Sequence, residues 1–78
     1  MKRMTCRQLG GACDLGFRAE TFEEMAELSR AHGMEMLNQG DAQHLEAMEA
    51  MKSLMADPAA MATWFEGKRA EFEALPDG

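Results

Sequence analysis

The stretch MTCRQLGGACDLGF, residues 4–17, contains both cysteines of this 78-residue chain and a Gly-Gly pair between them. Apolar and polar side chains alternate on each side of the two glycines. Met4 and Cys6 share one parity, and Cys13, Leu15 and Phe17 share another. Period-two alternation around a glycine-rich turn predicts two short antiparallel strands within residues 1–20. Both cysteines would then point toward the core from the apolar sides of their strands.

After residue 20 the apolar side chains recur with the period of a helix. The segment TFEE, residues 21–24, has the form of a capping box, in which the threonine hydroxyl caps a helix and the glutamate reaches back toward it. A helix over residues 21–38 would place one stripe toward the core, made of Phe22, Met25, Ala26, Ser29, His32, Gly33 and Met36.

Two further helices are predicted in the second half of the chain. Gly40 is a plausible stop, Asp41 a plausible N-cap for a helix over residues 41–56, and Asp57-Pro58 a strong start for a helix over residues 57–75. Their apolar faces would consist of His44, Ala47, Met48, Met51 and Met55, and of Met61, Trp64, Phe65, Phe72 and Leu75. The sequence therefore predicts an α+β fold, a hairpin followed by three amphipathic helices, in one small domain spanning residues 1–78.

Composition narrows the classes of function. A net charge of −6 disfavours binding to nucleic acid or to an anionic membrane, since both require clustered positive charge. No apolar run has the length of a secretory signal or a membrane span, so we expect a cytoplasmic protein whose thiols stay reduced, and a Cys6–Cys13 disulfide is the weaker interpretation. A core this small commonly needs a metal, a disulfide or a partner subunit.

Of these three, a metal is favoured by the predicted positions of the cysteine and histidine side chains. Cys6 and Cys13 lie on predicted apolar strand faces, and His32 and His44 lie on predicted apolar helix faces. Two thiolates and two imidazoles form an ordinary structural zinc set, and the thiolates cancel the charge of the ion. The spacing is unusual, because six residues separate the cysteines where zinc knuckles have two to four. Gly10 and Gly11 partly compensate for the wide spacing, because glycine permits the positive φ that a tight reversal of the chain between two strands requires.

A family resemblance supports the same interpretation. CRQLGGAC, residues 6–13, matches the pattern C-x-x-L-G-x-x-C, and a histidine follows eleven residues after the threonine of TFEE. With these motifs, residues 1–37 resemble a family of small bacterial proteins of unknown function described as predicted small metal-binding proteins. The resemblance implies metal binding by Cys6, Cys13 and His32. Family members usually carry a second histidine shortly after the first, and here we expect His44 to replace it as fourth ligand.

Other functions remain open at this stage. Each cysteine could be a small buried hydrophobe, and His44 could simply hydrogen-bond a backbone carbonyl. The Met-rich and aromatic helix faces could instead serve a helical protein-interaction module or a homo-oligomer, without metal. A thiol enzyme is less favoured, since the chain has no C-x-x-C and no oxyanion-hole motif. We therefore expect a metal-binding protein that is not an enzyme, with zinc as the ion.

Overall fold

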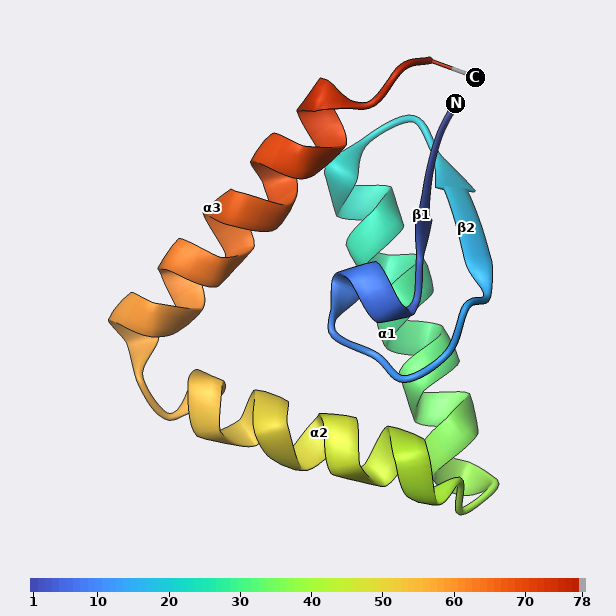
Figure 1. The fold of residues 1–78 in the computed structure, drawn as a ribbon, viewed down its shortest axis with the longest axis vertical. Helices are drawn as coiled ribbons and strands as arrows, with labels where there is room; N and C mark the ends of the chain where they lie inside the picture. The colour runs from blue at the N-terminus through green and yellow to red at the C-terminus, as the bar shows by residue number, and fades with distance from the viewer. Residues whose placement is uncertain (78) are drawn as a thin grey trace.

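The computed structural model describes residues 1–77 as a two-stranded hairpin followed by three helices (Figure 1). Strands β1 (Lys2–Thr5) and β2 (Gly16–Ala19) pair antiparallel, and the loop between them contains one turn of 3₁₀ helix, η1 (Arg7–Leu9). The helices are α1 (Phe22–Asn38), α2 (Ala42–Met55) and α3 (Pro58–Ala74). This arrangement confirms the predicted α+β fold.

The hairpin loop is longer than the alternation predicted. Met4 pairs with Phe17 and both are buried, but the paired strands end at Thr5 and resume at Gly16, so both cysteines lie in the loop. The prediction that Leu15 shares the inward face of a strand is wrong, because its side chain is 49% exposed. The loop is closed by its own backbone hydrogen bonds, such as the 2.8 Å bond from Arg7 N to Cys13 O, in place of a continuous strand ladder.

Side-chain caps begin all three helices where the sequence predicted them. Thr21 accepts a hydrogen bond from Glu24 N, Asp41 from His44 N, and Asp57 from Ala59 N and Ala60 N. Each oxygen satisfies an amide that the first helical turn leaves without a partner. Gly40 has a φ of +73°, a conformation that side chains disfavour, and it ends the turn between α1 and α2.

The core lies where the hairpin, α1 and α3 meet. Phe22 packs edge-to-face against Phe65 and Phe72, with ring centroids 5.1 Å and 5.9 Å apart. Within residues 1–77 the buried apolar side chains are Met4, Cys6, Leu9, Phe17, Ala19, Phe22, Met25 and Phe72. Helix α2 contributes no apolar side chain to this core. Met55 lies on the predicted apolar face of α2 together with His44 and Met51, but that face borders an open cavity and Met55 is 59% exposed.

Helices α1, α2 and α3 form the three sides of a triangle, and the hairpin lies over α1 (Figure 1). The molecule measures 33 × 29 × 15 Å, so it is only about as deep as one helix and the hairpin against it. Contacts between the tip of the hairpin loop and α2 and α3 close part of the triangle, because Gly10 lies against Met51 and Trp64. In the part of the chain that the structure describes, no helix is both long and apolar enough to cross a membrane.

Candidate metal centre

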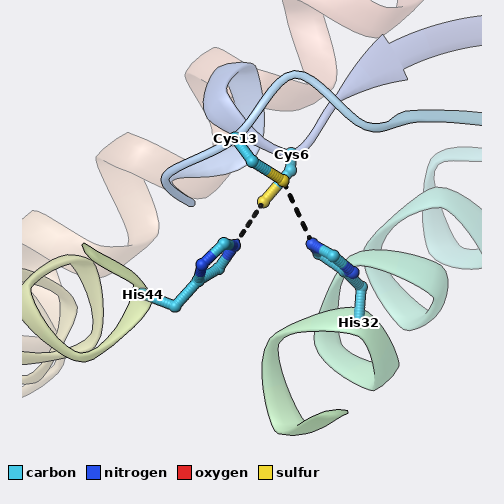
Figure 2. A group of neighbouring side chains, drawn as sticks. All are labelled: Cys6, Cys13, His32 and His44. Atoms are coloured by element: carbon cyan, nitrogen blue, oxygen red, sulfur yellow. Dashed lines mark hydrogen bonds between the residues drawn. The ribbon is translucent and has the colours of Figure 1, made fainter. Parts of the chain in front are cut away.

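The four candidate ligands come from three separate parts of the fold and point toward one another (Figure 2). Cys6 follows β1 and begins η1, and Cys13 lies in the loop before β2. His32 lies on the inner stripe of α1, and His44 occupies the first turn of α2. Cys6 and His44 are buried, at 3% and 6% exposed, while Cys13 and His32 are half-buried.

The distances between the ligand atoms are compatible with a tetrahedral metal site. All four atoms lie within 4.8 Å of one another. Cys6 Sγ is 3.6 Å from His44 Nε2, and Cys13 Sγ is 3.3 Å from His32 Nε2. With Zn–S of about 2.3 Å and Zn–N of about 2.0–2.1 Å, the sulfur–nitrogen edge of a tetrahedron is about 3.6 Å. The side chains are therefore positioned to hold a metal ion with little rearrangement.

The loop backbone brings the two thiols together despite the six residues between them. Gly11 N donates to Cys6 O at 2.8 Å, so the chain turns directly over the first cysteine. A Cβ on Gly11 would lie 2.1 Å from Cys6 Sγ, which makes glycine the one residue that fits there. Gly10 has a φ of +94° and completes the reversal. The glycine pair thus supplies what the wide cysteine spacing requires.

Asp41 orients His44 and was missed as a site residue by the sequence reasoning, which recognised it only as a helix cap. Asp41 Oδ2 accepts hydrogen bonds from His44 N at 2.9 Å and from His44 Nδ1 at 2.5 Å. With its proton held on Nδ1, the ring presents a free Nε2 to the cluster. Metal-binding histidines commonly use such a carboxylate partner. The signal in the sequence was the aspartate three residues before the histidine.

His32 is held by ring contacts. Its imidazole packs edge-on against Phe17, with centroids 5.6 Å apart, and against His44 at 5.3 Å. Phe17 is itself buried through its place in β2. The hairpin therefore helps to orient a ligand on α1 as well as supplying the two thiols.

The environment shifts the pKa values of the two thiols in opposite directions. A hydrogen bond with the backbone of Leu15, and then one with His32, lowers the pKa of Cys13 to about 7. Burial raises the pKa of Cys6, although backbone hydrogen bonds from Cys13 and Ala12 act against it. The hydrogen bond to Asp41 raises the pKa of His44. Cys13 is thus already a partial thiolate near neutral pH, the form that binds metals.

Comparison of the chain with protein-family models, with curated proteins and with solved structures finds no match. The structure brings together all four side chains that the sequence singled out, as two free thiols and two imidazoles. The arrangement is compatible with a metal site. Its support comes from the chain's own geometry.

Proposed function

We propose that this chain is a small, non-catalytic zinc-binding protein in which the metal mainly stabilises the fold. The observation that carries the proposal is the convergence of four soft or borderline ligand atoms within 4.8 Å, from segments up to 38 residues apart. The motifs in residues 1–37 that resemble a family described as predicted small metal-binding proteins point the same way. So does the carboxylate partner on His44.

The ligand set favours zinc in a structural role. Two thiolates and two neutral imidazoles cancel the charge of a divalent ion, so the site can be buried without a large desolvation cost. Four protein ligands also complete the tetrahedral coordination of zinc. A catalytic zinc keeps one position for water or substrate, and this set leaves none.

The size of the core explains what the metal would contribute. Eight apolar side chains are buried within residues 1–77, which is little for a domain to depend on. Structural zinc contributes about 10–16 kcal/mol of binding free energy in small peptides at neutral pH, against a typical domain stability of about 5–15 kcal/mol. Folding and metal binding would therefore be linked.

The deciding experiment is elemental analysis of the purified protein. We expect one zinc per chain in the native protein and none in a Cys6→Ser/Cys13→Ser variant, with a lower melting temperature. Ala12→Ser, in the same loop, introduces a hydroxyl without removing a ligand and should keep its zinc. Substitution by Co²⁺ should give the visible absorption of a tetrahedral site with thiolate ligands. A metal-free protein whose melting temperature does not change on adding zinc would overturn the proposal.

A further inference from the structure

An apolar cavity of about 500 Å³ lies between the three helices and the η1 loop. Its lining includes five of the nine methionines in the chain, together with Trp64 and Phe65. The methionines are Met34, Met48, Met51, Met55 and Met61. Cys6 and His44 also form part of the wall, so the cavity reaches from the surface to buried side chains.

The charged groups beside the cavity are already paired within the chain. Glu23 accepts a hydrogen bond from Arg69 at 2.5 Å, and Glu27 forms an ion pair with Arg30. Throughout residues 1–77, no buried side-chain nitrogen or oxygen lacks a hydrogen-bond partner. The cavity wall thus carries neither an unpaired charge nor a buried nitrogen or oxygen that lacks a hydrogen-bond partner. Its occupant should be uncharged and apolar.

The shape of the cavity favours a compact occupant over a protein surface. Helices α1, α2 and α3 run along three sides of it (Figure 1) and it is half open to solvent, whereas a helix docks into a groove that is open at both ends. A second copy of the chain would present the same hollow, and two hollows facing one another leave the space unfilled. A volume of about 500 Å³ falls within the range of about 300–1,000 Å³ that is usual for small-molecule sites.

We infer that this cavity is a binding site for a small, uncharged, apolar molecule. Methionine side chains are flexible and polarizable, so a wall built from them adapts to ligands of different outline. The inference goes beyond the proposed metal function and does not depend on it. Two of the four candidate metal ligands, Cys6 and His44, line the cavity, and the four together would complete a tetrahedral set without a further ligand.

Gly33 supplies the variant that tests the inference. It lies in the interior of α1, it lines the cavity, and a Cβ there would meet no atom within 4 Å. Gly33→Leu should therefore place its Cβ without a clash and extend its side chain into the cavity, and leucine favours a helix more than glycine does. Gly67 is the matched control. It lies within α3, a Cβ there also meets nothing, and it is not part of the cavity wall.

The experiment titrates the full chain, supplied with zinc, with the uncharged dye N-phenyl-1-naphthylamine. Trp64 is the only tryptophan and lines the cavity, so energy transfer from it to the dye reports binding, and the Gly33→Leu and Gly67→Leu pair tests whether the dye lies in the cavity. We expect saturation at one dye per chain. Gly33→Leu should weaken binding by about tenfold or more, since its side chain takes up volume that the dye needs, and Gly67→Leu should leave it within about twofold.

Three results would overturn the inference: binding that does not saturate, equal binding by Gly33→Leu and Gly67→Leu, or a dimer by light scattering that excludes the dye. Circular dichroism establishes that both variants are folded. If Gly33→Leu is not, ¹³C-methyl methionine spectra of the unsubstituted chain decide. The dye should shift Met48, Met51 and Met61 and leave Met1, which lies outside the cavity wall; the reverse pattern would refute the site. Zinc content is measured separately, so the metal proposal and this inference can fail independently.

Discussion

Gly11 shows how a single residue decides whether the thiols meet. Its Cβ position lies 2.1 Å from Cys6 Sγ and 3.0 Å from Cys6 O, and the backbone oxygen cannot swing aside as a side chain could. Gly11→Ala should therefore displace Cys6 and weaken zinc binding. We expect a loss of about 1–3 kcal/mol in the free energy of unfolding, typical of overpacking. Denaturant unfolding of the zinc-bound protein and chelator competition would measure the two effects.

The matched control is Gly67→Ala in α3. No atom lies within 4 Å of its Cβ position, so alanine should raise the free energy of unfolding by up to about 1 kcal/mol through helix propensity. Zinc affinity should be unchanged. If the two alanine variants behaved alike, the close packing of the loop against Cys6 would not matter to the metal centre.

Asp41 has two roles that substitution can separate, because one carboxylate both caps α2 and orients a candidate ligand. Asp41→Ala should lower zinc affinity by about 10–100-fold, as the loss of a ligand's hydrogen-bond partner commonly does. Asp41→Asn keeps an oxygen that can cap the helix and accept from His44 Nδ1, so its effect should be smaller. Asp57→Ala, which removes the cap of α3 alone, is the control that separates capping from metal binding. An equal loss of zinc affinity in Asp41→Ala and Asp57→Ala would contradict the orienting role.

At the scale of elements, the proposed metal would matter more to α2 than to the other helices. His44 is its one buried residue, whereas α1 and α3 are joined by the packing of Phe22 with Phe65 and Phe72. Removing zinc should therefore release α2 first. Amide hydrogen exchange after chelation should show protection falling most in residues 42–55, with less change in α1 and α3. Re-adding zinc should restore it, and a uniform loss along the chain would contradict the idea that the metal is the anchor of α2.

The elements also show what the sequence could and could not predict. The helices were predictable because capping is local: Thr21, Asp41 and Asp57 each bond amides within three residues. The inner stripe of α1 followed from the same local periodicity. The hairpin loop was not predictable. The alternation that placed Leu15 on the apolar side of a strand carries no information about the backbone hydrogen bonds that close the loop on itself.

The candidate site was likewise predictable only in part. Sequence reasoning selected its four side chains by type and by helix or strand face, and the structure brings them together. It could not place them, because the distance between Cys13 and His32 depends on how α1 packs against the hairpin. Asp41 was missed for a related reason, since its second hydrogen bond appears only once the His44 ring is oriented. The cavity was also beyond reach, since it exists only where three helices and a loop enclose it.

At the scale of the whole molecule, the proposed centre joins α2, which adds no apolar side chain to the core, to the hairpin loop and α1. A body only 15 Å deep cannot surround a large apolar core, and the ligands come from the hairpin loop, α1 and α2. One ion would then fix the orientation of three elements at once. The apolar surface of α2 and α3 that this arrangement leaves uncovered becomes the wall of the cavity.

The zinc-bound state should depend on pH, because the proposed ligands must lose their protons to bind the ion. Burial raises the pKa of Cys6, so zinc must displace its proton at neutral pH, while Cys13, with a pKa of about 7, gives up its proton only in part. Lowering the pH below 7 completes the protonation of the thiols, and His44 is protonated at a higher pH than an ordinary histidine because its hydrogen bond to Asp41 raises its pKa. Zinc affinity should therefore fall with falling pH, by on the order of a hundredfold per unit or more below 7, where zinc displaces two thiol protons and increasingly the proton of His44. Above 7 the slope should drop toward about tenfold per unit, because only Cys6 still carries a proton.

Chelator competition at pH 5, 6, 7 and 8 measures this slope, and the heat of binding in buffers of different ionisation enthalpy counts the protons released. The melting temperature of the zinc-bound chain should fall over the same range. The Cys6→Ser/Cys13→Ser variant has no thiol protons to displace, so its melting temperature should show no such dependence on zinc and pH together. An affinity that stayed flat from pH 8 to pH 5 would mean that the thiols are not the ligands, because a thiolate bound to zinc must compete with its own proton.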